Sequence, residues 1–426
     1  MRFIASLAAL CALGASAITV AAEDSWLISA DKIYTAPDAS PISNGTVLTT
    51  GEQIAAVADE RARMRIPKGT RSSECRGVVV AGFQNSHVHL MGSAFANAAN
   101  KPAAELEGAI SAMLTRYGVT TAFDTGSDLA NTLTIRSRID TGEVKGPRIL
   151  TAGWPIYPRD GIPFYLRDLP PEMLEQLRQP KDAAEAVQNV RANLAAGTDG
   201  TKLFVVTTPQ LGTAVEMLPD IARAAADETH ARGKLVLSHP TSIVGIRNAL
   251  NAGVDIVVHT TLGERQPWDE ALTREMAEKK MSLVPTLKLW PYELAKQQVP
   301  QFVVDQLVGA TIEELRAFKA AGGQVLFGTD VGYMHEFDPT DEYVLMSKAG
   351  LSAMDILASL TTAPAERWQE SKRRGRVEAG MAADLVVLGS DPADDVKNFA
   401  DVRCVFRAGK LIYSAQERLA SEKAKP

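Results

Sequence analysis

Cysteine and long hydrophobic runs are both scarce in this chain of 426 residues. Only three cysteines occur, Cys11, Cys75 and Cys404, which are too few for a disulfide-rich scaffold. The apolar run at residues 3–13 is shorter than the about 20 residues that a transmembrane helix requires, and no later segment resembles a membrane span. The sequence therefore argues against a disulfide-built domain and against a membrane anchor.

The short apolar run near the N-terminus fits an export signal. Arg2 provides the positive charge before it, and Ala15-Ser16-Ala17 or Val20-Ala21-Ala22 provides a cleavage site of small residues. We therefore expect a signal peptide at residues 1–22 and an exported protein, periplasmic or secreted.

An excess of positive charge is also lacking. The formal net charge is -6 at pH 7, which argues against nucleic acid as a partner. We expect a small-molecule substrate instead, and a homo-oligomer remains possible.

From about residue 80, short β-branched runs alternate with longer segments rich in Ala, Leu, Glu and Arg. This alternation is typical of parallel βαβ units and predicts the α/β class. Eight strands are expected, at residues 77–83, 119–124, 148–152, 201–206, 234–238, 255–258, 282–286 and 324–328. Eight such units predict a (β/α)8 TIM-like barrel over residues 80–369, with its chemistry at the carboxyl ends of the strands.

Both ends of the mature chain carry short strand-like runs outside this barrel. They lie at residues 46–48, 55–57, 384–388 and 402–407. We expect residues 23–79 and 370–420 to form one small β-sandwich-like domain. Cys75 and Cys404 fall in this domain, where a disulfide and two buried free thiols are both possible.

Histidine is rare, and its few positions are informative. Of six histidines, His87 and His89 follow the first expected strand, while His239 and His259 end two others. Strand alternation places His87 and His89 on one face, although His-x-His alone also occurs as ordinary strand sequence. Asp330 follows the eighth strand. Histidine and aspartate are common metal ligands, and several of them stand at the ends of expected strands. This pattern predicts a metal site.

The pocket residues are harder to predict. Residues 154–180, rich in proline and aromatics, form either a pocket wall or a surface excursion. Five side chains after strands three, seven and eight are candidate substrate contacts, and each fits packing or solvent exposure equally well: Tyr157, Arg159, Trp290, Tyr333 and His335. His230 closes an expected helix, where a C-terminal charge role fits better than metal binding.

Several stretches together resemble the amidohydrolase superfamily, in particular its imidazolonepropionase-like and prolidase-like branch. They are Val80-Ala81-Gly82-Phe83 before His87 and His89, Gly197-Thr198-Asp199-Gly200-Thr201-Lys202, Ala231-Arg232-Gly233-Lys234 before His239, Ala252-Gly253-Val254-Asp255 before His259, Gly328-Thr329-Asp330, and residues 380–388. The resemblance spans nearly the whole mature chain.

The resemblance implies two divalent metal ions, most often zinc. His87, His89 and Asp330 would hold one ion and His239 and His259 the other, with a carbamate on Lys202 bridging both. A carbamate suits this place because an ammonium group would repel the cations. The alternative is an unmodified Lys202 in a salt bridge beside a single metal.

The implied reaction is attack of a metal-bridging hydroxide on a carbonyl, with Asp330 as the proton shuttle. We expect hydrolysis of a carbon–nitrogen bond in an amide or cyclic amide other than an ordinary peptide. An esterase or lactonase using the same site is an alternative, as is a non-catalytic exported protein that binds metal or solute. Dipeptide cleavage loses support because the Gly-Gly-His and Ser-Gly-Gly elements of many prolidase-like relatives are absent.

Overall fold

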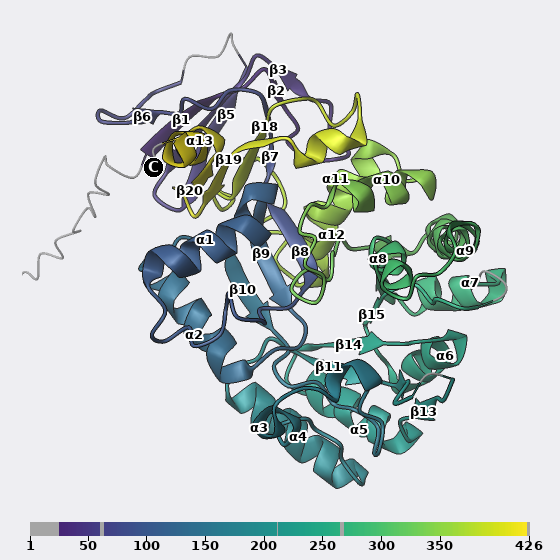
Figure 1. Ribbon diagram of the computed structural model, residues 1–426. Coiled ribbons are helices and arrows are strands. Elements are labelled where there is room, and N and C mark those ends of the chain that lie inside the picture. Colours follow the sequence, from purple (N-terminus) through teal and green to yellow (C-terminus); the bar gives the residue numbers. More distant parts are fainter. Residues whose placement is uncertain (1–24, 60–63, 211, 265–267, 424–426) are drawn as a thin grey trace, which may run out of the picture.

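The computed structural model describes residues 25–59, 64–210, 212–264 and 268–423. The signal peptide expected at residues 1–22 lies outside these residues. The chain has an α/β fold, as predicted, with a β-rich region built from both chain ends beside a larger region of parallel strands and helices (Figure 1).

The larger region contains eight parallel strands in two sheets. The three-stranded sheet has the order β10 (Arg148–Thr151), β9 (Val119–Asp124), β8 (Phe83–Val88), and the five-stranded sheet has the order β11 (Gly200–Phe204), β14 (Leu235–His239), β15 (Ile256–Val258), β16 (Ser282–Val284), β17 (Gln324–Val325). These named strands form two sheets and not one closed ring. All eight are buried or nearly so because helices cover them, as expected for parallel strands.

Backbone hydrogen bonds connect the two parallel sheets at both junctions. At one junction, the amide of Ser86 donates to Phe327 and that of Asp330 donates to His87, at 2.8 and 2.9 Å. At the other, Ile156 donates to Lys202 at 2.9 Å, and Asp199 donates to Thr151 at 2.7 Å. The segments that follow β17 and β10 therefore run beside β8 and β11.

The first expected barrel strand is wrong in position. Residues 78–81 form β7 (Val78–Ala81), which pairs with β18 (Leu385–Leu388) in the β-rich region. The strand that leads to the histidines is β8, which begins only at Phe83. The other seven expected strands coincide with parallel strands, although β16 and β17 are shorter than expected.

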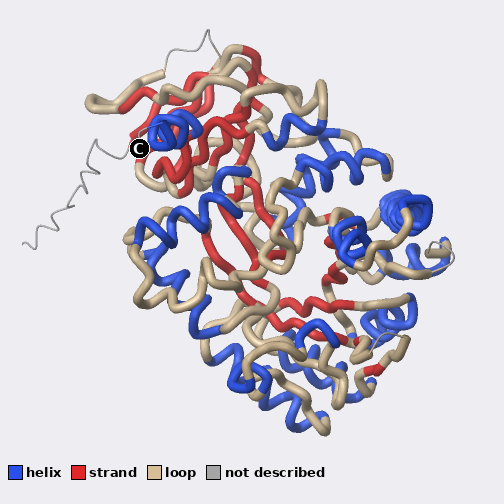
Figure 2. Tube along the Cα trace, viewed as in Figure 1, coloured by secondary structure: helices blue, strands red, loops and turns tan. Residues whose placement is uncertain are grey.

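Helices surround the parallel strands, which lie in the interior (Figure 2). Local signals begin several of them: the Asp182 side chain accepts from the amide of Glu185, and Pro219 occupies the first turn of its helix. The helices are α1 (Ala103–Met113), α2 (Leu129–Asp140), α3 (Pro171–Leu174), α4 (Ala183–Ala195), α5 (Pro219–His230), α6 (Ile243–Ala252), α7 (Glu270–Glu278), α8 (Leu289–Lys296), α9 (Gln301–Ala320), α10 (Thr340–Lys348), α11 (Ala353–Leu360), α12 (Thr362–Arg367) and α13 (Ala415–Lys423), with 3-10 turns η2 (Thr115–Tyr117), η3 (Phe164–Leu166) and η4 (Val396–Ala400).

The β-rich region consists of two sheets that share one core. One has the order β5 (Gln53–Ala58), β4 (Thr46–Thr50), β1 (Ser25–Ser29), β6 (Arg71–Ser72), and the other β20 (Lys410–Ser414), β19 (Val402–Arg407), β18, β7, β2 (Lys32–Ile33), β3 (Ile42–Ser43). A two-stranded sheet, β12 (Val206–Thr207) and β13 (Val215–Glu216), lies apart. Ile28 and Val47 from one sheet pack with Val79 and Val387 from the other. Chain segments more than 300 residues apart thus bury one hydrophobic core.

Cys75 and Cys404 form a disulfide in this core, with their Cα atoms 6.2 Å apart. This bond joins the N-terminal and C-terminal contributions to the region. Of the two possibilities that the sequence left open, the structure has the disulfide.

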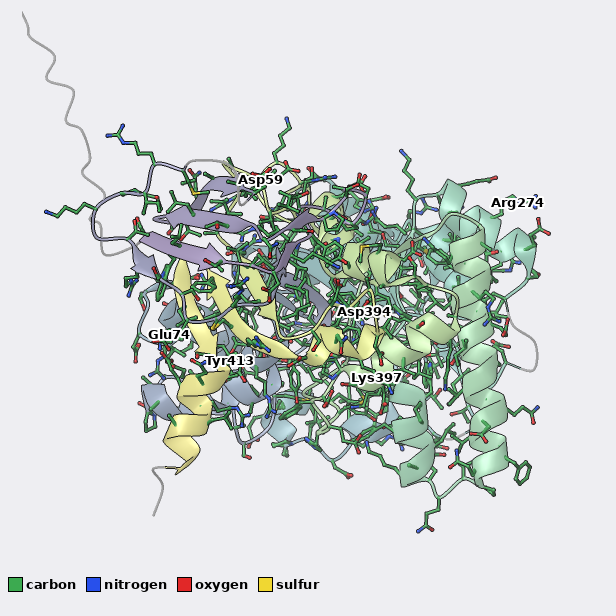
Figure 3. All side chains as sticks on the ribbon, turned by 90° about the horizontal axis from the view of Figure 1, so that it is seen from above. Asp59, Glu74, Arg274, Asp394, Lys397 and Tyr413 are labelled. Carbon is green, nitrogen blue, oxygen red and sulfur yellow. A yellow bond between two sulfur atoms is a disulfide. The ribbon has the colours of Figure 1, made fainter. Side chains whose placement is uncertain are left out.

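Arg274 and Lys397 are exposed, and Arg274 lies at the edge of the molecule in the view of Figure 3. Among the described residues, no helix has both the length and the apolar character to cross a membrane.

Candidate metal centre

The ends of the parallel strands converge on one cavity of about 370 Å³, within the size range of small-molecule sites. Six of its lining residues are those predicted as metal ligands, and we call them the ligand cluster: His87, His89, Lys202, His239, His259 and Asp330. The structure therefore brings all six together, although they come from five strands and span 244 positions in the chain.

Three members of the ligand cluster form a tight group. The Nε2 atoms of His87 and His89 lie 3.2 and 3.1 Å from Oδ1 of Asp330. The ligand atoms of these three residues lie within 4.8 Å of one another. Backbone bonds hold the segments together, because the amide of His89 donates to Val331 at 2.8 Å and that of Asp330 to His87 at 2.9 Å.

A cation fits between these three side chains. Oδ1 of Asp330 is buried and has no hydrogen-bond partner among the described residues, although two imidazole nitrogens lie close to it. A buried carboxylate oxygen without a partner is costly. Neutral histidine and carboxylate are common ligands of zinc and similar divalent ions, and an ion at this position would satisfy all three groups.

The histidine rings are oriented by hydrogen bonds on their other nitrogen. Nδ1 of His89 donates to the carbonyl of Gly126 at 2.7 Å, which leaves Nε2 directed at Asp330. Nδ1 of His259 lies 2.6 Å from the Thr286 hydroxyl, which itself donates to the Pro285 carbonyl. That hydroxyl must therefore accept from Nδ1, so Nε2 of His259 carries the free lone pair. Such second contacts are typical of metal-bound histidine.

The Gly126 carbonyl is itself held by a buried acid. Asp124, at the end of β9, accepts hydrogen bonds from the hydroxyls of Ser127 and Thr132 at 2.7 and 2.8 Å, and from the amide of Gly126 at 3.3 Å. The Ser127 hydroxyl also accepts from the amide of Leu90. The turn that orients His89 is therefore fixed to both β8 and α2.

His239 and His259 form the other side of the cluster. Their ring centroids are 4.7 Å apart, and Nε2 of His259 lies 4.0 Å from Oδ2 of Asp330. The His239 ring stacks on Phe204, with centroids 4.9 Å apart and planes at 17°. His239 is therefore positioned by an aromatic face, whereas His89 and His259 are positioned by hydrogen bonds.

Lys202 is buried in the middle of β11, with 1% of its surface exposed. Within the described part of the chain no carboxylate lies within 4.0 Å of its amine, and the amine faces the Phe204 ring at 5.4 Å. The salt-bridge alternative for Lys202 therefore has no partner in this structure.

Burial controls the protonation of the cluster. It lowers the pKa of His87 and of His239 to about 3, with a further contribution from Lys202, so both rings are neutral at pH 7. It also lowers the pKa of Lys202 to about 7, against the attraction of Asp330. His89 differs: burial lowers its pKa, but the Asp330 carboxylate outweighs burial and raises it.

Strained backbone accumulates at the same strand ends. His259, Thr286 and Asp330 have positive φ angles of 78°, 45° and 59°, a conformation that costs non-glycine residues about 1–3 kcal/mol each. Gly332 has φ +100°, and a Cβ there would lie 1.8 Å from the carbonyl oxygen of His89. These conformations occur where the backbone directs the side chains of His259 and Asp330 into the cavity.

Aromatic side chains surround the cavity above the ligand cluster. We call this set the aromatic wall: Tyr157, Phe164, Tyr165, Phe204, Trp290 and Tyr333. The sequence pointed to Tyr157, Trp290 and Tyr333, and residues 154–180 contribute to the wall through Tyr157 and η3. Arg159 and His335 are exposed and do not line the cavity.

Sequence reasoning missed Phe164, Tyr165, Phe204 and Glu293, all of which line the cavity. Phe204 lies two residues after Lys202 on the same strand, so strand alternation already placed both side chains on one face. Glu293 lies one turn into α8, the helix that follows β16, and no sequence pattern singled it out. Phe164 and Tyr165 belong to the aromatic-rich residues 154–180 that the sequence marked as a possible pocket wall, but neither was singled out as a substrate contact.

Known proteins resemble this chain in both sequence and structure. Ochratoxinase of Aspergillus niger is 22% identical over 204 residues, which span 45% of this chain and 41% of that enzyme. Its crystal structure superimposes with a TM-score of 0.74 at 18% identity, covering 92% of this chain and 96% of that one. A Xaa-Pro dipeptidase has a TM-score of 0.76 at 21% identity, covering 92% and 100%, and phenylurea hydrolase B 0.73 at 21%, covering 91% and 96%.

The amidohydrolase family profile matches residues 78–412. This match begins at β7 and ends within β20, so it includes every member of the ligand cluster and the strands β7, β18 and β19 of the β-rich region. The chain belongs to the amidohydrolase family.

Proposed function

We propose that this protein is an exported, metal-dependent hydrolase that cleaves the carbon–nitrogen bond of a small amide or cyclic amide other than an ordinary peptide. One observation carries the metal dependence: Oδ1 of Asp330 is buried without a hydrogen-bond partner, beside Nε2 of His87 and His89. The short apolar run at residues 3–13 is the basis for a signal peptide at residues 1–22 and for a periplasmic or secreted location.

We further propose that the eight parallel strands form a single (β/α)8 TIM-like barrel, with a β-sandwich-like domain from residues 23–79 and 370–420. The backbone hydrogen bonds from Ser86 to Phe327 and from Ile156 to Lys202 support this arrangement, because they join the two sheets at both edges. The position of the cavity at the carboxyl strand ends fits such a barrel.

The ligand cluster has enough donors for two divalent ions, and zinc suits them best. His87, His89 and Asp330 would hold one ion, and His239 and His259 the other, with a carboxylated Lys202 between them. When bound, the ions would supply an activated water and polarise the substrate carbonyl. The pKa of Lys202, about 7, leaves much of its amine neutral at pH 7 and able to react with carbon dioxide.

Asp330 is suited to move a proton. The imidazoles of His87 and His89 keep its pKa well below the usual value despite burial, so it is ionised at pH 7, and its Oδ1 has no hydrogen-bond partner among the described residues. In the proposed reaction, the carboxylate passes a proton from water to the leaving nitrogen. The orienting bonds to Gly126 and Thr286 keep the neighbouring rings still during this transfer.

Similar proteins support a carbon–nitrogen bond as the target. Two of the similar structures are named as a dipeptidase and a phenylurea hydrolase, and both peptides and ureas contain a nitrogen bonded to a carbonyl. Because the sequence lacks the Gly-Gly-His and Ser-Gly-Gly elements, we favour a non-peptide amide over a dipeptide.

The proposal is tested by metal analysis of the purified chain together with hydrolysis of matched amides, esters and lactones. We expect more than one tightly bound divalent ion per chain and release of amine from an amide. Less than one ion per chain contradicts the proposed metal dependence. Turnover of esters or lactones but not of amides supports the esterase or lactonase alternative. A bare Lys202 amine by mass analysis, in protein supplied with bicarbonate, contradicts the carbamate.

A further inference from the structure

One side of the cavity is a continuous stack of rings that begins at the metal centre. The Tyr157 ring stacks on Phe204 with centroids 4.6 Å apart and planes at 25°. Phe204 in turn stacks on His239 at 4.9 Å and 17°. Since His239 belongs to the ligand cluster, this side of the aromatic wall starts directly beside the reacting groups.

The remaining wall residues come from other segments. Tyr165 contacts Tyr333 edge to face at 5.7 Å, and Trp290 contacts His259 at 6.1 Å. The indole nitrogen of Trp290 donates to the Thr260 hydroxyl at 2.7 Å, so its polar atom is already satisfied and its ring remains for packing. Aromatic faces from β11, α8 and two loops thus meet over one cavity.

Outside the ligand cluster, the described lining of the cavity offers no lysine or arginine to an anionic substrate group. Among the described lining residues, Lys202 is the only lysine or arginine, and it lies in the ligand cluster. Lys296, which does not line the cavity, pairs with Glu293 at 2.8 Å and lies over the rings of Tyr292 and Tyr333 at 4.1 and 4.8 Å. Glu293 itself lines the cavity, and its pairing with Lys296 leaves this side of the cavity without a free cation for a substrate carboxylate.

We propose that the substrates are uncharged amides that carry a planar aromatic group next to the scissile carbon–nitrogen bond. This inference rests on the proposed hydrolase function and specifies its substrate. Water adds across the bond: the carbonyl carbon gains oxygen as the acid product, the nitrogen gains the proton and leaves as an amine. The aromatic group packs against the wall, which offers no free cation for a substrate carboxylate.

Three probes test separately whether the enzyme prefers an aromatic ring and whether it disfavours a carboxylate. They are N-benzoylglycinamide, N-(cyclohexanecarbonyl)glycinamide and N-benzoylglycine. They share one scissile bond type, while the first two differ in the ring and the third adds a carboxylate. We expect kcat/KM for the benzoyl amide to exceed that for the cyclohexane amide by about tenfold, the size of a good aromatic contact, and to exceed that for N-benzoylglycine because the wall offers no free cation for the carboxylate. Equal values for the two ring types, or a preference for the carboxylate, overturn the proposal.

A matched pair of variants assigns this preference to the wall. Tyr333→Leu removes the ring and is expected to reduce the benzoyl-to-cyclohexyl ratio by about threefold or more, whereas Tyr333→Phe keeps the ring and the ratio. Phe302→Leu, at a residue that is 74% exposed on α9 and does not line the cavity, should leave the ratio unchanged. A ratio that is unchanged in Tyr333→Leu contradicts the role of the wall.

Binding separates failure of this inference from failure of the hydrolase function. Calorimetry with the metal-loaded Asp330→Asn variant measures affinity for the same probes without turnover. Tighter binding of the benzoyl amide than of the other two supports the substrate class even if the parent chain hydrolyses none of them, in which case the hydrolase function fails. Equal affinity for all three probes overturns the substrate class and leaves the hydrolase function standing.

Discussion

The ligand cluster and the aromatic wall line the same cavity but are built differently. The cluster lies on strands or directly after them, and hydrogen bonds to Gly126 and Thr286 fix two of its rings. The wall comes mostly from loops and helix starts, and two members, Phe164 and Tyr165, are 39% exposed. The reactive groups thus lie on the strands, which hold them in place, and most substrate contacts lie on loops, which tolerate changes in sequence.

The largest effect that follows from this difference is expected at Asp330. Asp330→Asn keeps the shape but removes both the negative charge and the proton acceptor, so kcat should fall by about 10²–10⁴-fold. Steady-state kinetics measure this loss, with circular dichroism as the control for folding. Near-normal activity would show that the cluster does not carry the proton transfer.

A smaller effect is expected at the group that orients His259. Thr286→Val removes the hydroxyl that accepts from Nδ1, so affinity for the metal should fall by about 10–100-fold. Thr286→Ser keeps the hydroxyl and is the matched control. Competition with a chelator measures both variants. If the two variants bind metal equally well, the hydroxyl does not orient the ring.

Phe204 belongs to the aromatic wall but stacks on His239 of the ligand cluster. Its substitution therefore tests whether metal binding and substrate preference depend on separate residues. Phe204→Leu should weaken both metal affinity and the preference for aromatic substrates, each by about 2–10-fold. Phe164→Leu, at the exposed part of the wall, should change only the substrate preference. Metal titration and kinetics with the benzoyl and cyclohexyl probes measure the two effects. An effect of Phe204→Leu on substrate preference alone would mean that the stack does not support His239.

The last effect is on stability and not on catalysis, and it concerns a buried acid outside the ligand cluster. Glu314 on α9 accepts from the amide and hydroxyl of Thr261, at 2.8 and 2.7 Å, and so holds the segment after His259. Burial raises its pKa from 4.5 to about 8. Between these pH values the folded chain binds a proton that the unfolded chain has lost, so stability falls as pH rises, by at most about 1.4 kcal/mol per pH unit.

Glu314→Gln should flatten this slope because glutamine does not titrate. Urea unfolding at pH 5 and pH 8 measures the difference. Glu342, whose pKa burial raises to about 7, contributes over an overlapping range, so some slope should remain. An identical slope in the variant and the parent would show that Glu314 does not titrate in this range.

Sequence patterns predicted the strands of the parallel sheets well but misplaced the first one. Val78-Val79-Val80-Ala81 reads as a buried strand in either sheet, and periodicity does not reveal the partner. The two strands separate at Gly82, where a Cβ would lie 2.2 Å from the Thr120 hydroxyl. Only the contact with β9 shows why the chain changes sheets at this residue.

The substrate contacts were predicted less well than the ligand cluster for the same reason. Arg159 and Tyr157 are separated by one residue, yet Tyr157 is buried against Phe204 and Arg159 faces solvent. In a loop, the direction of a side chain follows from contacts with distant segments and not from a repeat. Residue type and proximity to a strand end therefore identified three of the six wall residues and two exposed ones.

The sequence by itself determined which side chains stand at the ends of the parallel strands, because strand alternation and the βαβ order leave little freedom there. The tertiary structure alone decided that His87 and Asp330, 243 residues apart, meet at 3.2 Å. It also decided which nitrogen of each ring faces the centre and which aromatic rings meet over it. Those features depend on how strand ends and loops from distant parts of the chain pack together, and no local pattern encodes that packing.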